Sequence, residues 1–206
     1  MNIVLGHRAT QQVVFAGPFG VGKTTALRAV SDIPVSNTDE LSSELSQLKN
    51  SLGKTTTTVG FDYGEWNFSD GARVGLIGLP SQERFSAMWD MLLPKSSAVV
   101  LWLYGNSDDA LADCRFWLEA LTQRQAVTRL AVALTRLPFD VSEETLAPFR
   151  HLTSLYHPLA PVLTADPRQP ASVMQAIMVA LSTPDAAPFP PPATPPAQQG
   201  KSNDEF

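Results

Sequence analysis

Residues 17–24 read Gly-Pro-Phe-Gly-Val-Gly-Lys-Thr, and this stretch constrains the fold more than any other part of the chain. It fits the pattern G-x-x-x-x-G-K-[ST] without a mismatch. The apolar run at 13–16 predicts a buried strand before it, and the apolar periodicity of 25–30 predicts a helix after it. A strand, this loop and a helix form the context in which the pattern binds phosphate groups. The alternative is an ordinary glycine-rich turn before a helix, which the full match disfavours.

The residue types of this loop suit the chemistry of a polyphosphate. Glycine permits backbone angles at which successive N–H groups curl around phosphate oxygens, and the glycines here are Gly17, Gly20 and Gly22. Lys23 is placed to reach the β- and γ-phosphates, and the Thr24 hydroxyl to bind Mg²⁺. Thr25 follows at the position expected to contact the α-phosphate.

Composition limits the class of protein. The 206 residues suit one domain with some tail, and a formal net charge of −5 argues against a nucleic-acid or polybasic membrane surface. The single cysteine, Cys114, is compatible with a reducing cytosol and excludes an internal disulfide framework. No signal peptide is recognised, and no apolar run approaches 18 residues, so we expect a cytoplasmic protein without membrane insertion.

Strands and helices are expected to alternate along the chain. The predicted strands are 12–16, 59–68, 72–79, 98–103, 129–135 and 161–164, with a possible edge strand at 2–5. A helix that ends near 32 is predicted after the phosphate loop, and further helices are predicted at 39–49, 84–93, 108–126, 142–154 and 171–182. The helix at 108–126 is expected to place Leu111, Cys114, Leu118 and Leu121 on one apolar face. A turn at 69–71 joins two strands into a hairpin. The order predicts an α/β fold, with a mostly parallel sheet, one antiparallel strand and helices on both faces. A ligand then lies beyond the carboxyl ends of the strands.

The last 23 residues differ in kind. Seven of the 17 prolines lie in 184–206, with alanine, glutamine and a polar end. This composition predicts a disordered tail on a domain of residues 1–183, and a polyproline docking segment is the less favoured alternative.

Two later stretches narrow the class. Residues 54–64 read KTTTTVGFDYG, and residues 74–85 read VGLIGLPSQERF. With the phosphate loop, they resemble the Ras-type small GTPases, and more closely the bacterial gliding-motility and polarity branch, the MglA group. The resemblance covers about residues 11–182. It implies the P-loop NTPase fold of small G proteins, a GTP/GDP cycle with Mg²⁺, and a roadblock (LC7-type) regulator that binds the switch regions.

The resemblance also implies roles for particular residues. Thr58 matches the first switch threonine, which meets Mg²⁺ and the γ-phosphate, and Gln82 matches the glutamine that orients the attacking water, with Lys23 as the third catalytic residue. Simpler alternatives are a strand threonine and an exposed helix start. Metal binding is expected at Thr24 and Thr58. The implied nucleotide-binding residues are Gly17, Gly20, Val21, Gly22, Lys23, Thr24, Thr25, Thr58, Ser81, Thr135, Arg136 and Ala165.

The chain departs from the family at several positions. Gly78 stands where Ras-type proteins have an aspartate that supports Mg²⁺, a loss that the polarity branch also tends to show, and Ser81 replaces a glycine. The strand that ends at Thr135 continues into Arg136, Leu137 and Pro138, so the guanine-reading aspartate is missing, and Asp140, two residues late, would substitute only if the loop bulges. The preference for guanine over adenine therefore stays open. A non-hydrolysing pseudo-GTPase that acts as a scaffold is the main alternative function, and a P-loop kinase is a weaker one. The four tryptophans are expected mainly to pack in the core, and Trp89, which follows the second switch stretch, is also a candidate for a partner surface that changes with nucleotide.

Overall fold

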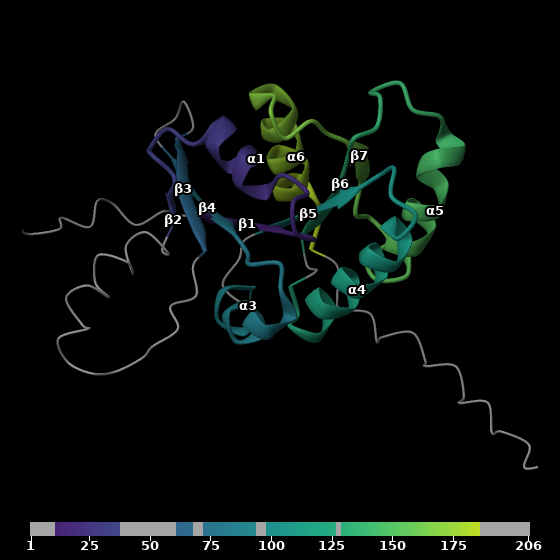
Figure 1. Ribbon diagram of the computed structural model, residues 1–206, viewed down its shortest axis with the longest axis horizontal. Helices are drawn as coiled ribbons and strands as arrows, with labels where there is room; N and C mark the ends of the chain where they lie inside the picture. The colour runs from purple at the N-terminus through teal and green to yellow at the C-terminus, as the bar shows by residue number, and fades with distance from the viewer. Residues whose placement is uncertain (1–10, 38–60, 68–71, 94–97, 127–128, 186–206) are drawn as a thin grey trace, which may run out of the picture.

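The computed structural model describes residues 11–37, 61–67, 72–93, 98–126 and 129–185 (Figure 1). These residues form a seven-stranded sheet in the order β2-β3-β4-β1-β5-β6-β7. The strands are β1 (Gln11–Ala16), β2 (Ser36–Asn37), β3 (Asp62–Asn67), β4 (Arg73–Gly78), β5 (Ala98–Tyr104), β6 (Leu130–Thr135) and β7 (Val162–Thr164). β3 pairs antiparallel with both β2 and β4, and the other pairings are parallel. One strand therefore runs against the rest, as predicted.

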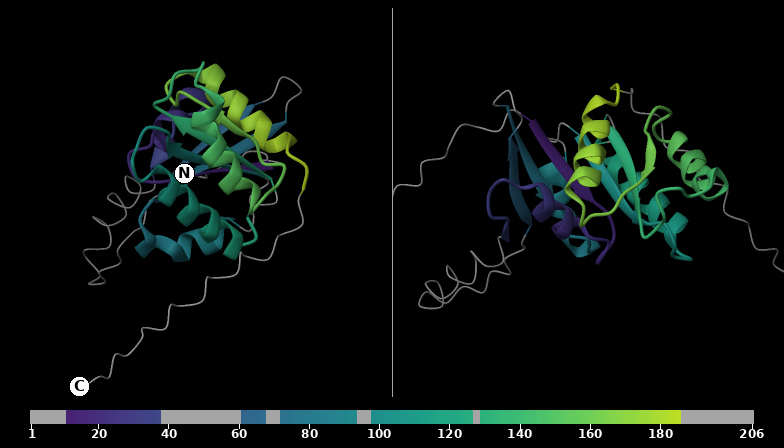
Figure 2. Two further views of the ribbon diagram at one scale, coloured as in Figure 1. Left: turned by 90° about the vertical axis from the view of Figure 1, so that its right-hand side faces the viewer. Right: turned by 90° about the horizontal axis from the view of Figure 1, so that it is seen from above.

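Helices cover both faces of the sheet. They are α1 (Lys23–Val30), α3 (Ser86–Leu92), α4 (Ala110–Gln123), α5 (Glu143–Ser154) and α6 (Pro170–Ser182), with a 3₁₀ turn, η2 (Glu83–Phe85), before α3. α1 and α6 lie on one face, and α3 and α4 on the other (Figure 1), and Figure 2 shows the two layers from the side. The predicted α/β architecture is thus confirmed.

The two cores follow from the alternation of side chains along each strand. In β5, Val99, Leu101 and Leu103 belong to the core beneath α3, α4 and α5, whereas Val100 and Trp102 belong to the core beneath α1 and α6. β1, β5 and β6 are buried almost throughout, as expected for parallel strands that are covered on both faces.

Two local predictions need correction. The predicted apolar face of helix 108–126 includes Leu111, but its side chain is 42% exposed, and Trp117 is buried in that layer instead. The helix predicted at 84–93 begins as the 3₁₀ turn η2 and becomes α-helical only at Ser86. The short edge strand β2 was not predicted, because its polar sequence carries no strand pattern. The predicted elements at 2–5 and 39–49 and the turn at 69–71 lie outside the described residues.

The end of the domain is held to the sheet. Arg129, just before β6, forms an ion pair with Asp185 at 2.8 Å. The remainder of the predicted tail, 186–206, lies outside the described residues. None of the described helices has the length and apolar character that crossing a membrane requires.

Candidate functional site

The loop between β1 and α1 has the backbone that the sequence demands. Gly17, Gly20 and Gly22 all adopt positive φ angles, of 134°, 74° and 109°. At Gly17 a side chain is also impossible for lack of space, because a Cβ atom would lie 2.0 Å from the carbonyl oxygen of Trp102 on β5. Gly22 occupies the N-cap of α1. The loop therefore turns tightly against the sheet and delivers the chain into a helix N-terminus, where partial positive charge favours an anion.

Lys23 is drawn back over this loop. Its ammonium Nζ donates hydrogen bonds to the carbonyl oxygens of Gly17 and Pro18, both at 2.8 Å, and to the Ser81 Oγ at 2.6 Å. The residue is only 8% exposed. Burial lowers the pKa of Lys23 to about 8, and the nearby carboxylate of Asp62 opposes that shift. A desolvated ammonium held between the loop and residue 81 is a strong point charge for an incoming phosphate.

Asp62 is a site residue that the sequence analysis missed. It lies at the start of β3, and the Thr24 hydroxyl donates a hydrogen bond to its Oδ2. In the β3–β4 register Asp62 stands opposite Gly78, the position where Ras-type proteins have their aspartate. A Cβ atom at Gly78 would come within 3.1 Å of the Asp62 Cβ. The Asp62 carboxylate thus lies beside Thr24 on the strand next to Gly78, and the glycine leaves room for it.

A hollow of about 420 Å³ opens beside the loop. Three connections line it, those that follow β1, β6 and β7, and all three leave the carboxyl ends of parallel strands. The lining residues are Gly20, Val21, Gly22, Thr25, Thr135, Arg136, Leu137, Phe139, Ala165, Asp166, Pro167 and Arg168. Most of the sequence-predicted nucleotide residues therefore meet at one place, at the sheet edge where a ligand was expected.

The predicted base-side residues have defined partners in the structure. The Thr135 hydroxyl donates to the Leu103 carbonyl at 3.2 Å, and the Ala165 N–H donates to the Leu134 carbonyl at 2.9 Å. Arg136 has a left-handed backbone, with φ of 60°, and its guanidinium carbon lies 4.4 Å from the centre of the Tyr104 ring. Sequence reasoning did not identify Phe139 and Arg168 as lining residues, because they lie in loop positions without a recognisable pattern.

The residues after β4 join the phosphate loop to α3. Ser81 accepts the bond from Lys23, and Gln82 follows it with an exposed side chain at the start of η2. One residue before Ser81, the carbonyl of Pro80 accepts a 2.8 Å hydrogen bond from the indole N–H of Trp89. Trp89 is 1% exposed, so the prediction that it lies on a partner surface is wrong; it packs inward against Trp117 at a ring distance of 4.7 Å.

The oxygen atoms of Thr24 and Asp62 suit a hard cation that takes most of its remaining ligands from a bound substrate. Magnesium prefers oxygen ligands and usually combines one or two carboxylates with phosphate oxygens. Thr24 and Asp62 offer a hydroxyl and a carboxylate side by side. Within the described part of the chain, no group of three or more His, Cys, Asp or Glu residues could hold a metal ion by itself. Thr58, the other predicted metal and catalytic residue, lies outside the described residues.

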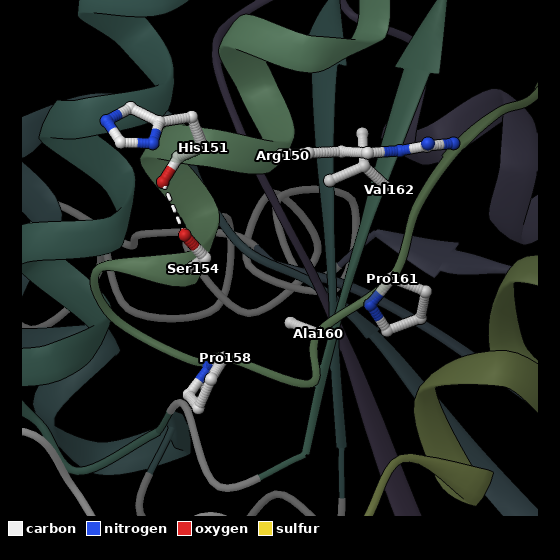
Figure 3. Close-up of a pocket in the computed structure, with 7 residues that line it drawn as sticks. All are labelled: Arg150, His151, Ser154, Pro158, Ala160, Pro161 and Val162. Atoms are coloured by element: carbon white, nitrogen blue, oxygen red, sulfur yellow. Dashed lines mark hydrogen bonds between the residues drawn. The ribbon is translucent and has the colours of Figure 1, made fainter. Parts of the chain in front are cut away.

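A second hollow, of about 500 Å³, lies at the amino end of β7, away from the phosphate loop (Figure 3). It contains none of the predicted site residues and is lined by Arg150, His151, Ser154, Pro158, Ala160, Pro161 and Val162. Two of its polar side chains are engaged within the protein: the Ser154 hydroxyl donates to the His151 carbonyl, and Arg150 pairs with Glu143. We therefore place the candidate site at the smaller hollow, where the chemistry converges.

No protein-family model matches the sequence, and no curated protein is significantly similar to it.

Proposed function

We propose that this protein is a nucleotide-dependent switch with the P-loop NTPase fold of small G proteins, similar to the MglA group. It binds a purine nucleoside triphosphate, of which GTP is the one that the resemblance implies, together with Mg²⁺. The observation that carries the proposal is the buried Lys23 ammonium, held over a positive-φ glycine loop at a helix N-terminus. Buried ammonium groups are costly unless an anion compensates them, and a β- or γ-phosphate is suited to do so.

Thr24 and Asp62 are the described residues that would hold the cation. The ion itself supplies charge neutralisation to the phosphates when it is bound. Asp62 accepts a hydrogen bond from the Thr24 hydroxyl, so the lone pairs of that oxygen would be free to bind the cation. Thr58 stays a predicted ligand from the preceding segment of the sequence.

Hydrolysis would follow the scheme of small GTPases. Water attacks the γ-phosphorus, the bond from that phosphorus to the β–γ bridging oxygen breaks, and the diphosphate and inorganic phosphate leave. Gln82 is the residue we assign to orient the water. No arginine immediately precedes Thr58 in the sequence, so we expect turnover to be slow without an activator, because an arginine finger contributes about 10³–10⁵ in rate.

The partner we propose is a roadblock-type regulator that binds the residues after β4. Their position supports this role, since Ser81 contacts the phosphate-loop lysine and Trp89 ties the same loop to α3. A change at the phosphates would therefore be transmitted from Lys23 through Ser81 and Pro80 to α3. The alternative function is a scaffold that binds nucleotide without hydrolysing it. It is motivated by the absence of the aspartates at Gly78 and Pro138 from the sequence.

The test is nucleotide binding by isothermal calorimetry in magnesium buffer, followed by single-turnover phosphate release. We expect binding by the full chain and none by Lys23→Ala, with Lys201→Ala, a tail lysine, as the matched control. Absence of heat with every purine nucleotide would overturn the proposal. Binding without phosphate release, with and without a regulator, would select the scaffold instead.

A further inference from the structure

The hollow beside the phosphate loop is large enough to receive more than phosphates. In a nucleotide-binding site of this arrangement it would hold the base and the ribose. Guanine presents a carbonyl oxygen that needs a donor, and two kinds of N–H group that need an acceptor. Which of these demands the loops after β6 and β7 can meet decides what base the site selects.

The loop after β7 has no main-chain donor to spare. Each N–H that it carries is used within the protein, and Pro167 has none. The donations run from Ala165 to Leu134 O (2.9 Å), Asp166 to Ser172 Oγ (3.0 Å), Arg168 to Asp166 Oδ1 (2.9 Å) and Gln169 to Asp166 O (3.1 Å). A guanine carbonyl would therefore have to compete with bonds that hold the end of β7 and the start of α6.

The carboxylate in the lining is also engaged. Asp166 accepts bonds from the Arg168 main chain, from Arg168 Nε at 3.0 Å and from Arg168 Nη2 at 2.8 Å. These bonds from Arg168 lower the pKa of Asp166 to about 2. Of the residues that line the hollow, Asp166 is the acidic one. It serves as a local turn cap, and it is not presented as a free acceptor for guanine N–H groups.

An aromatic surface is what the hollow does offer. Phe139 lines it and is 63% exposed, so its ring is accessible to a ligand in the hollow. Leu137 and Pro167 add apolar surface, and the Arg136 guanidinium, already stacked on Tyr104, adds a planar cation. Stacking on a ring does not discriminate among bases, because every base has a π-face.

We propose, on the basis of the nucleotide-binding function above, that the hollow holds a purine ring by stacking on Phe139 and does not read its Watson–Crick edge. The protein then binds ATP and GTP with similar affinity. Its selectivity among ligands then comes from its contacts with the phosphates and the metal, and not from contacts with the base.

Competition calorimetry of the full chain with ATP and GTP in magnesium buffer tests the inference. We expect dissociation constants that agree within about tenfold. A larger preference for either purine would overturn the inference and leave the nucleotide-binding function intact. Binding of neither purine would overturn both.

Two phenylalanine variants test the stacking surface. Phe139→Ala should weaken the binding of both purines by about tenfold and leave their ratio unchanged. Phe116→Ala is the matched control, because Phe116 is a 40% exposed aromatic residue on α4, on the other face of the sheet. Equal affinities of the Phe139 variant and the unaltered chain would show that the ring does not contact the base. Circular dichroism of both variants confirms that they fold.

Discussion

Asp62 on β3 lies opposite Gly78 on β4, and its carboxylate accepts a hydrogen bond from Thr24. Replacing Asp62 by asparagine keeps the size of the side chain and an acceptor for Thr24 but removes the charge. Residues that support a metal site contribute about 10–100-fold in metal affinity. We therefore expect Asp62→Asn to raise the Mg²⁺ concentration needed for half-maximal nucleotide binding by about tenfold.

The matched control for this change lies on the same strand. Glu65 on β3 accepts a hydrogen bond from Tyr63 and pairs with Arg73, away from the phosphate loop. Glu65→Gln should leave the Mg²⁺ requirement unchanged. An equal shift in both variants would mean that the effect comes from the strand and not from the Asp62 carboxylate.

The buried Lys23 ammonium has a consequence for stability at alkaline pH. Burial lowers its pKa from the ordinary value of 10.5, which the group regains when the chain unfolds, to about 8 in the folded protein. Between these values the unfolded chain holds a proton that the folded chain has released. The free energy of unfolding therefore rises with pH there, by up to about 1.4 kcal/mol per pH unit, whereas below pH 8 the contribution of this group does not change with pH.

Urea unfolding of the unaltered chain and of Lys23→Met, at pH 7, 8, 9 and 10, measures this contribution. The difference in unfolding free energy between the two proteins should be constant up to about pH 8 and should then shift in favour of the unaltered chain. Parallel curves across the whole range would contradict the assigned pKa.

At the scale of elements, the segment that follows β4 links the phosphate loop to α3 through hydrogen bonds at Ser81 and Pro80. A phosphate that engages the Lys23 ammonium competes with the Ser81 hydroxyl, and the adjoining Pro80 carbonyl holds the Trp89 indole. We expect nucleotide binding to change the intrinsic tryptophan fluorescence and the change to be lost in Trp89→Phe. Trp66→Phe on β3 should retain it. If the Trp89 variant retained the full fluorescence change, the effect of nucleotide binding would not be transmitted to α3 through Trp89.

The order of elements was predictable because hydrophobic periodicity and the phosphate-loop pattern are local signals. The buried runs of β5 and β6 and the helix after residue 22 needed no tertiary information. Asp62 was not predictable in the same way. Its place beside Thr24 depends on the register of β3 against β4, and a shift by one residue would turn the carboxylate to the opposite face. The prediction of the buried face of α4 was wrong for a similar reason, because tertiary packing buries Trp117 and leaves Leu111 exposed.

At the scale of the whole molecule, ligand binding should stabilise the fold by mass action. The proposed site is formed by the phosphate loop, the β4 end and the loops after β6 and β7, so a bound nucleotide would connect four parts of the sheet. At a ligand concentration of 100 times the dissociation constant the gain is about 2.7 kcal/mol, which corresponds to a rise in Tm of about 5–10 °C. Differential scanning fluorimetry with and without Mg²⁺ and nucleotide measures it. A similar rise in Lys23→Ala would assign the stabilisation to another site.

The carboxylate beside Thr24 also has a position in the sequence that matters. Thr58 precedes Asp62 by four residues, so the same short length of chain carries two of the groups that we assign to the cation. In the usual small G protein these groups belong to separate segments. Under the proposed function, a binding partner that pulled this segment away from the site would remove Thr58 and Asp62 from the ion together. Such a partner would weaken the binding of the triphosphate without inserting a side chain of its own into the site.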